Sequence, residues 1–547
     1  MLSGLMLVCT TCLGAIPPAV DFDLQGCIDQ QLKAGATKVV VPPGRYRVTP
    51  KHAVHLALHG LKDVEIGCDG VEMVCTETTQ AISISDCTRL TLHGLSIDYD
   101  PLPFTQGHIT QLSPDKKTVD VELFEGYPPA SAARNFKYEI FRPDTRTLRC
   151  EDRYISKLEA VDERHLRLTA PGGKAANAEQ VGDLIVIGAE YTPHGNAGHA
   201  IVCERNTEVE LRDINLYASN CFGFLEGECD ASRYVRCHID RRAPENDPVK
   251  RADARLRTLN ADANHSSNAL RGPSYIECSA SFMGDDAINI HGSYHLVTDC
   301  QPAGDNTALR VLCNNRFLAA VGEPVELWAY EGLRLPDATV VAVEPDSPET
   351  DDEIVWLGKQ NIYPYFRHNW HPKIIKLTVA GHVTLSRGSV VAAARHMGNG
   401  FLVQGCRFGF MRSRGILIKA SDGKVIGNTL TSCMMASVLV APEWWWLESG
   451  SSCNVEVRDN HIINCHGIPI SVEAVAGTGK IAPAGAHRHL TISGNTIEGS
   501  PAPLIRVQST DGLSLTGNVL RPTNDGEVIV LRNCAAVTQD GNRVEGQ

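Results

Sequence analysis

The stretch HLTISGNTIEGS, residues 489–500, alternates apolar and polar positions and bends at an Asn, and GLSLTGNVLRP, residues 512–522, repeats the pattern. The two asparagines, Asn495 and Asn518, are 23 positions apart. Alternation with a period of two indicates short β-strands, and Asn or Gly between strands is typical of a bend. A strand motif that recurs at this period predicts the coils of a parallel β-helix.

The same motif recurs elsewhere in the chain. Its C-terminal asparagines are spaced by 32, 35, 23 and 24 residues, and they are Asn428, Asn460, Asn495, Asn518 and Asn542. Earlier copies read TRLTLHGLSIDY at 88–99, TEVELRDINLYAS at 207–219 and SYIECSASFMG at 274–284. An antiparallel sandwich would not repeat one motif at such a period. We therefore expect an all-β chain that forms a right-handed parallel β-helix, a solenoid whose coils stack about 4.8 Å apart.

Two segments of about a hundred residues interrupt the period with denser alternation, as in DLIVIGAEY and EPVELWAY. They predict two small antiparallel β insertions, the second one barrel-like. The expected organisation is a signal peptide at 1–19, an N-terminal cap with the first coils at 20–100, an insertion at 101–199, coils with the catalytic acids at 200–297, the second insertion at 298–396 and C-terminal coils at 397–547.

Composition narrows the class of protein. The 547 residues are 43% hydrophobic and 21% charged, as in an ordinary soluble globular protein, and the net charge is −13. This charge argues against a nucleic-acid partner and against a polyanionic substrate. The 19 cysteines are scattered singly, so they predict small core residues and no metal site.

The first sixteen residues, MLSGLMLVCTTCLGAI, are apolar and uncharged. They resemble the apolar core of a secretory signal, although the basic residues that usually precede it are missing. A secreted or periplasmic location follows as a prediction. The run is too short for a membrane span and no other stretch qualifies, while the sequence leaves room for a homo-oligomer.

The stretch SFMGDDAINIHG, residues 281–292, places Asp285 and Asp286 side by side in a strand-like context. Asp262 precedes Asp285 by 23 residues, so stacking of the coils should bring it level with the pair. Carboxylates this close repel one another, and at least one should have a raised pKa. A protonated acid beside an ionised one is what glycoside hydrolysis requires. A solvated acidic turn is the alternative, but the register and the nearby His265 and His291 favour a catalytic site.

Several motifs together resemble glycoside hydrolase family 110, the exo-acting α-1,3-galactosidases of blood-group-B type. The resemblance covers most of the chain and both insertions. The motifs are IDYDPLPFTQG at 97–107, NADANH at 260–265, MGDDAINIHG at 283–292, RGILIKASDG at 414–423 and WWWLESG at 444–450.

The resemblance implies an inverting hydrolase that removes terminal α-1,3-linked galactose from an oligosaccharide or glycoconjugate, with neither metal nor cofactor. It assigns Asp285 as the general acid, with Asp262 and Asp286 positioning and deprotonating a water molecule. Inversion generally needs the acid and the base about 6.5–9.5 Å apart. The family carries a more compact aromatic-Glu-Gly motif than WWWLESG, which puts the role of Glu448 in question.

Other residues are candidates for binding the sugar. An aromatic face packs against the C–H face of galactose, and polar groups fix its hydroxyls. Alternation sends one or two of the three consecutive tryptophans into the core. Lys419 stands in an otherwise apolar strand, where a charge indicates either a site-facing or an exposed position. The predicted substrate-binding residues are His265, His291, Lys419, Trp445, Trp446, Glu448 and Arg257.

Three other readings stay open. Polygalacturonases combine a β-helix with a similar acidic triad, but no Gly-His-Gly motif is present and RGILIK matches their basic motif only loosely. A polysaccharide lyase would need a basic cleft or a calcium site. A non-catalytic β-helical adhesin or glycan-binding protein predicts that the three aspartates can become asparagine without loss of binding.

Overall fold

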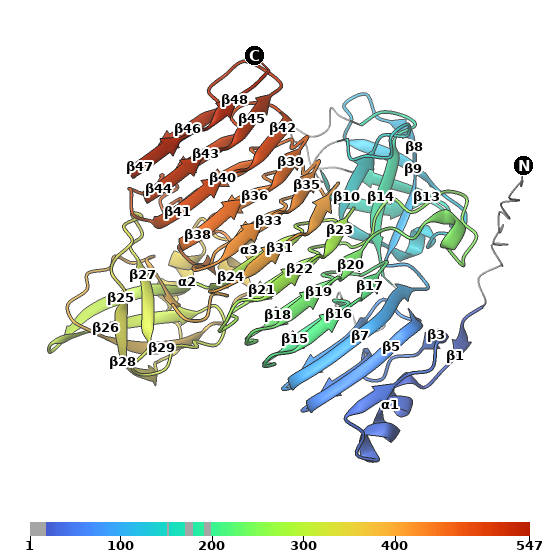
Figure 1. Cartoon of the computed structure of the whole chain (residues 1–547), viewed down its shortest axis with the longest axis horizontal. Helices are drawn as coiled ribbons and strands as arrows, with labels where there is room; N and C mark the ends of the chain where they lie inside the picture. Colours follow the sequence, from blue (N-terminus) through green and yellow to red (C-terminus); the bar gives the residue numbers. More distant parts are fainter. Residues whose placement is uncertain (1–17, 150–152, 170–178, 191–197, 547) are drawn as a thin grey trace, which may run out of the picture.

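The chain forms the expected parallel β-helix with two β insertions (Figure 1). The computed structural model describes residues 18–149, 153–169, 179–190 and 198–546. The predicted signal peptide, residues 1–19, therefore falls almost entirely outside the described residues. Among those described, no helix is long and apolar enough to cross a membrane.

Each coil contributes strands to two parallel sheets. Sheet B, which carries the candidate site, has one short strand per coil. In order along the solenoid its strands are β4 (Val54–His59), β6 (Gln80–Ser85), β15 (Ile201–Glu204), β18 (Phe224–Gly227), β21 (Asn264–Ser267), β24 (Ile288–Ser293), β33 (Ile416–Ile418), β36 (Val438–Val440), β40 (Ile470–Val472), β43 (Ile505–Gln508) and β46 (Ile529–Arg532).

Sheet A covers the rest of the solenoid wall, and most coils contribute two strands to it. In the first half these are β1 (Val20–Asp21), β2 (Lys38–Val40), β3 (Gly44–Val48), β5 (Lys62–Cys75), β7 (Thr88–Tyr99), β16 (Glu210–Arg212), β17 (Asn215–Leu216), β19 (Arg233–Val235), β20 (His238–Ile239), β22 (Ser274–Ile276) and β23 (Ser279–Ser281). In the second half they are β31 (Leu402–Gln404), β32 (Arg407–Gly409), β34 (Lys424–Ile426), β35 (Thr429–Thr431), β38 (Cys453–Arg458), β39 (His461–Ile463), β41 (His487–Ser493), β42 (Thr496–Ser500), β44 (Thr510–Thr516), β45 (Val519–Pro522), β47 (Ala535–Asp540) and β48 (Arg543–Val544).

Stacked apolar side chains fill the solenoid. Inward-facing Ile290, Ile418 and Val440 come from consecutive strands of sheet B and are buried. Helix α1 (Leu24–Lys33) lies at the N-terminal end of the solenoid and buries Leu24 and Ile28 in the same core. The cysteines in the described residues are free and most are buried, as expected for small core residues.

The repeating asparagines form an internal ladder. Asn460 donates from Nδ2 to Asn495 Oδ1 at 2.9 Å and to the carbonyl of Val425 at 3.0 Å. Its own Oδ1 accepts from Asn428 Nδ2 at 2.9 Å. Because these amides are buried, each coil satisfies polar groups of its neighbour, which explains the sequence repeat.

The first insertion is a seven-stranded antiparallel sheet between β7 and β15. In spatial order its strands are β11 (Arg153–Tyr154), β10 (Ala133–Phe141), β14 (Leu184–Ala189), β8 (Phe104–Leu112), β9 (Thr118–Leu123), β13 (His165–Thr169) and β12 (Lys157–Ala160). It also includes a 3₁₀ turn, Ala130–Ala132, and a second such turn, Pro244–Asn246, lies in the solenoid segment that follows β20.

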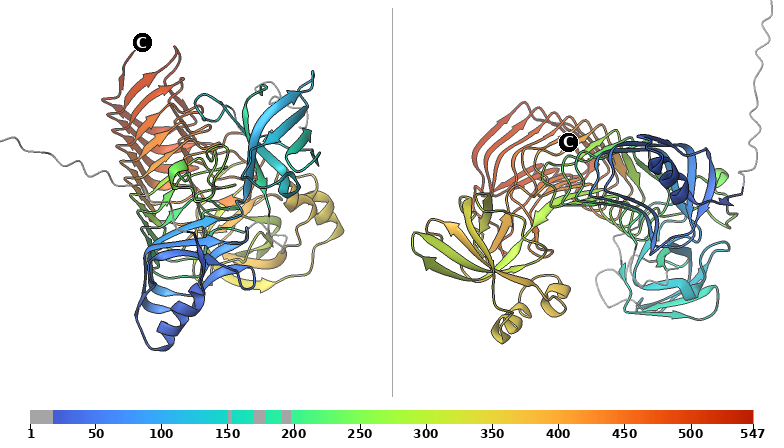
Figure 2. Two further views of the ribbon diagram at one scale, coloured as in Figure 1. Left: turned by 90° about the vertical axis from the view of Figure 1, so that its right-hand side faces the viewer. Right: turned by 90° about the horizontal axis from the view of Figure 1, so that it is seen from below.

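The second insertion follows β24 and is a closed six-stranded barrel. Its strands are β25 (His295–Ala303), β26 (Asn306–Cys313), β27 (Pro324–Trp328), β28 (Ala338–Pro345), β29 (Lys373–Ala380) and β30 (Val390–Ala393), with α2 (Asp351–Leu357) and α3 (Pro364–His368) between β28 and β29. Both insertions project from the same side of the solenoid (Figure 2, right). Sheet B runs between them, since β15 follows the first insertion and β24 leads into the second.

Candidate active site on sheet B

Three aspartates meet where two neighbouring coils enter sheet B. Asp262 lies two residues before β21, and Asp286 lies two residues before β24. The strands pair with Asn264 opposite Ile288, and the peptide N–H of Asp286 donates to Asp262 Oδ1 at 3.3 Å. Asp262 is therefore level with the aspartate pair, as the spacing predicted, and lies opposite Asp286.

The three carboxylates are close together but differ in exposure. One oxygen from each lies within 4.8 Å of the other two. The side chain of Asp285 is 25% exposed, whereas those of Asp262 and Asp286 are 7% and 2% exposed. A molecule on the outer face of sheet B would therefore meet Asp285 first, with the other two recessed.

Positive side chains balance two of the three charges. Arg414 donates to both oxygens of Asp286, from Nε at 3.0 Å and from Nη2 at 2.8 Å. Arg412 donates to Asp285, and the Lys137 ammonium of the first insertion lies 3.6 Å from the same carboxylate. The insertion thus supplies part of the site.

Burial and these neighbouring charges give Asp262 and Asp285 different pKa values. Burial raises the pKa of Asp262 to about 6, and the charges of Asp285 and Asp286 act in the same direction. Burial also acts to raise the pKa of Asp285, but Arg412 and Lys137 outweigh it and lower this pKa to about 2. A proton bound by the cluster therefore resides on Asp262 when no substrate is present.

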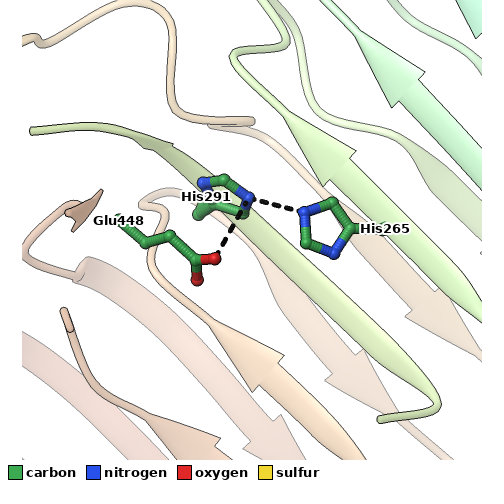
Figure 3. Close-up of side chains that lie close together, drawn as sticks. All are labelled: His265, His291 and Glu448. Carbon is green, nitrogen blue, oxygen red and sulfur yellow. Dashed lines mark hydrogen bonds and ion pairs between the residues drawn. The ribbon is translucent and has the colours of Figure 1, made fainter. Parts of the chain in front are cut away.

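A histidine pair extends from Asp262 along the outer face of the sheet. His265 Nδ1 lies 2.7 Å from Asp262 Oδ2, and its Nε2 lies 2.9 Å from Nε2 of His291 (Figure 3). Nδ1 of His291 lies 2.7 Å from the carbonyl of Gly292, so this nitrogen must carry the hydrogen. Burial lowers the pKa of His291 to about 4. His291 is thus neutral and accepts a hydrogen bond from Nε2–H of His265.

A buried lysine continues the network. Lys419 directly follows β33, and its partners bury it fully. Its Nζ lies 2.6 Å from Glu448 and 3.0 Å from Glu443. Burial opposes its charge, but the two glutamates outweigh burial and raise the pKa of Lys419. Asn289 donates to Glu448 at 3.2 Å, and Arg414 binds Glu443 at 2.8 Å. The chain of contacts from the histidines therefore returns to Arg414, which binds the aspartate cluster.

Glu448 comes from β37 (Glu448–Ser449), which pairs antiparallel with the end of β24. His265, His291 and Glu448 offer two nitrogens and an oxygen within 4.8 Å (Figure 3), a donor set that zinc accepts. However, the two nitrogens already share a hydrogen bond, and a cation there would face the fixed charge of Lys419 beside Glu448. The cluster fits a hydrogen-bond network better than a cation site.

Arg257 lies apart from the outer face of sheet B. It is 1% exposed and pairs with Glu139 of β10 at 2.9 Å. Its Nη1 donates to Asn260 at 2.9 Å, two residues before Asp262. This arginine therefore joins the first insertion to the loop that carries Asp262, and its burial leaves it no surface for direct contact with a sugar.

Trp445 and Trp446 lie beyond the charged network, at the second insertion. Each is 39% exposed, and both contact the ring of Tyr363, with ring centroids 6.3 Å and 4.3 Å away. Trp444 is buried against Tyr294, as alternation predicted for one or more of the three. The structure thus brings seven predicted binding and catalytic positions into one cluster of contacts but leaves Trp445, Trp446 and Arg257 outside it.

Sequence reasoning missed four charged residues of the site: Arg412, Arg414, Glu443 and Lys137. The first two stand in MRSRG, one coil after the aspartate pair, and this position in the repeat was a usable signal. Glu443 directly precedes the tryptophans. Nothing in the sequence near Lys137 marks it, because it reaches Asp285 across the fold.

Comparison with known proteins gives a consistent set of relatives, although no family model matches the chain. Alpha-1,3-galactosidase B of Bacteroides thetaiotaomicron is 22% identical over 96% of this chain and 88% of that protein. Alpha-1,3-galactosidase A of Bacteroides fragilis is 22% identical over 99% of this chain and 92% of that protein. Among solved structures, the family 28 exopolygalacturonase of Yersinia enterocolitica aligns over 95% of this chain and 76% of that one, with 9% identity and a TM-score of 0.41.

Proposed function

We propose that this protein is a glycosidase that removes terminal α-1,3-linked galactose from glycans of blood-group-B type or their linear counterparts. The observation that carries this proposal is the cluster of three carboxylates on the outer face of sheet B, in which the pKa of Asp262 is raised and that of Asp285 is lowered. The near full-length similarity to alpha-1,3-galactosidases supports the choice of sugar and linkage.

In the proposed reaction a single proton moves through the carboxylate cluster. It passes from Asp262 to Asp285, whose oxygen lies within 4.8 Å. Asp285 then protonates the glycosidic oxygen as the bond from that oxygen to the anomeric carbon breaks. Asp262, now ionised, takes a proton from the attacking water, and Asp286 helps to hold this water. The products are galactose and the shortened glycan.

We further propose inversion at the anomeric carbon. The carboxylate separation is smaller than the usual 6.5–9.5 Å of inverting enzymes, so spacing does not support this assignment. Their burial favours it: Asp262 and Asp286 are almost fully buried, so in the proposed reaction they act on the sugar through a water molecule. A retaining enzyme would need one of them to bond directly to the anomeric carbon.

The test is to incubate the purified protein with Galα1-3Gal, the B-trisaccharide and an aryl α-galactoside, and to follow the products by NMR. We expect galactose to be released first as the β-anomer, with and without EDTA. Asp262→Asn, Asp285→Asn and Asp286→Asn should each abolish release from Galα1-3Gal and the B-trisaccharide and retain the circular dichroism of the parent. Hydrolysis by all three variants, or no release from any α-galactoside, would disprove the proposal, and α-galactose as first product would disprove inversion.

A further inference from the structure

A groove of about 240 Å³ lies beyond the charged network, and the reaction at the aspartates does not use it. It is formed by the turns after β36 and β40 together with the segment between α2 and α3 of the second insertion. We call it the tryptophan groove, and its polar and aromatic lining residues are Asn361, Glu443, Trp444, Trp445 and Glu473.

The tryptophan groove adjoins the aspartate cluster. Glu443 lines the groove and also binds Arg414 at 2.8 Å, and Arg414 in turn binds Asp286 at 2.8 Å. Strand β36 is two coils beyond β24 in sheet B, which corresponds to roughly 10 Å along the solenoid. A glycan whose terminal sugar lies at the aspartates could therefore extend into the groove with its next sugars.

The cavity between the aspartate cluster and the first insertion is much smaller. It is lined in part by Arg134, Lys137 and Arg257 and measures about 10 Å³. This volume suffices for about one water molecule and not for a sugar. The tryptophan groove is therefore the better of these two places for the part of the glycan that leaves from Asp285.

The groove has the chemistry of a sugar subsite. Trp445 offers an exposed indole face for the C–H face of a pyranose, and Asn361 and the glutamates offer partners for hydroxyls. Its two carboxylates are paired, Glu443 with Arg414 and Lys419 and Glu473 with Arg506. Among the described lining residues none is basic, so the groove offers an anionic sugar no cationic partner. The second insertion holds Trp445 in place, because the peptide N–H of Tyr363 donates to its carbonyl at 2.7 Å.

We propose that the tryptophan groove binds the neutral reducing-side portion of the glycan and so gives the protein its preference for extended substrates. This inference rests on the proposed function, since it assigns a second sugar site to the same reaction. It gives Trp445 a role outside the galactose position.

The test compares α-galactosyl fluoride, which has almost nothing beyond galactose, with the trisaccharide Galα1-3Galβ1-4GlcNAc. We expect Trp445→Ala to lower the ratio of kcat/KM for the trisaccharide to that for the fluoride at least tenfold, mainly through KM. Val475→Trp, which fills the groove from an exposed position at its edge, should lower the ratio similarly. Tyr365→Ala removes an equally prominent exposed aromatic of α3 that does not line the groove, and should leave the ratio unchanged.

The outcomes separate this inference from the proposed function. If the unmodified protein hydrolyses neither substrate, the proposed function fails. If it hydrolyses both and neither groove variant changes the ratio, or if Trp445→Ala impairs both substrates equally, the groove does not bind the reducing-side sugars. The ratio can also be measured with a sialylated or sulfated analogue in place of the trisaccharide. If Trp445→Ala lowers that ratio as much as it lowers the ratio for the neutral trisaccharide, the groove does not prefer neutral glycans.

Discussion

Asp262, Asp285 and Asp286 are chemically identical but are held in different states by their surroundings. Asp286 is buried and paired with Arg414, Asp285 is partly exposed and faces Arg412 and Lys137, and Asp262 is buried without a cation on its oxygens other than His265. Three close carboxylates cannot all ionise at low cost, so the one with the least compensation keeps the proton. In the proposed reaction this asymmetry makes Asp285 the acid and Asp262 the base.

Replacing the proposed acid, Asp285, and the proposed base, Asp262, should change the activity on two substrates in different ways. Loss of a general acid typically costs about 10²–10⁴-fold in rate, but only where the leaving group needs a proton. We expect Asp285→Asn to lose activity on Galα1-3Gal and to keep most of it on α-galactosyl fluoride. Asp262→Asn should lose activity on both. Steady-state kinetics with the two substrates measures this, and the opposite pattern would exchange the two roles.

The pH dependence of kcat/KM should reflect the loss of the proton that the three aspartates share. The reaction needs one proton in the cluster, and this proton leaves with a pKa of about 6 at Asp262. We therefore expect kcat/KM for Galα1-3Gal to fall about tenfold per pH unit above pH 6.

A histidine variant tests which group causes this fall of kcat/KM above pH 6, the descending limb of the pH profile. The hydrogen bond from His265 lowers the pKa of Asp262, so His265→Gln should move the descending limb to higher pH. His489→Gln, an exposed histidine of β41 on sheet A, is the control and should leave the profile in place. An unchanged limb in His265→Gln would show that another group controls it.

Among the elements, the asparagine ladder ties coil to coil. Asn460 serves two neighbours at once, whereas Asn542 is half-buried and bonds only to the preceding coils. Leaving buried polar groups unsatisfied costs about 1–3 kcal/mol. Asn460→Ala should therefore lower the free energy of unfolding by about that amount and Asn542→Ala by less, as measured by chemical denaturation. Equal losses would contradict a cooperative ladder.

Across the whole molecule, buried ion pairs join segments far apart in the chain. Arg255, seven residues before Asp262, donates to both oxygens of Asp98 at 2.9 Å, 157 residues away in sequence. Burial acts to raise the pKa of Asp98, but Arg255 and Arg242 outweigh it and lower this pKa to about 2. The pair anchors the segment that leads to Asp262 to the end of β7, where the first insertion begins.

Breaking this pair should destabilise the fold. Removing one partner of a buried pair costs about 3–5 kcal/mol, so Arg255→Met should lower the free energy of unfolding by that order at neutral pH. Because the pKa of Asp98 is lowered on folding, the stabilisation is present above its ordinary pKa near 3.8 and is lost as pH falls through about 2. Arg205→Met, which breaks an exposed pair with Asp86, should cost less than about 1 kcal/mol. Similar losses for both variants would contradict this role of Arg255.

The period of the asparagine motif and the spacing of the aspartates were enough to predict the β-helix, the insertions and the meeting of Asp262 with the pair. Both depend on local repetition, which a linear sequence displays directly. The 23-residue spacing left open which member of the pair lies opposite Asp262, and the pairing of β21 with β24 makes it Asp286. His265, His291, Lys419 and Glu448 were predicted one by one as sugar-binding residues. The structure places them in one network, and sugar binding by them stays a prediction.

Only the tertiary structure decided which charges neutralise the aspartates and where the tryptophans lie. Arg412 binds Asp285, which is 127 residues away in sequence. Lys137 donates to the carbonyl of Gly284, which is 147 residues away. Arg257 forms an ion pair with Glu139 of the first insertion. The coil repeat could have indicated Arg412, but the pairs of Lys137 and Arg257 depend on how the first insertion packs, and the sequence around each partner does not indicate the other. The coil repeat determines where the carboxylates stand, while packing of the two insertions against the solenoid determines their charge and what lies beside them.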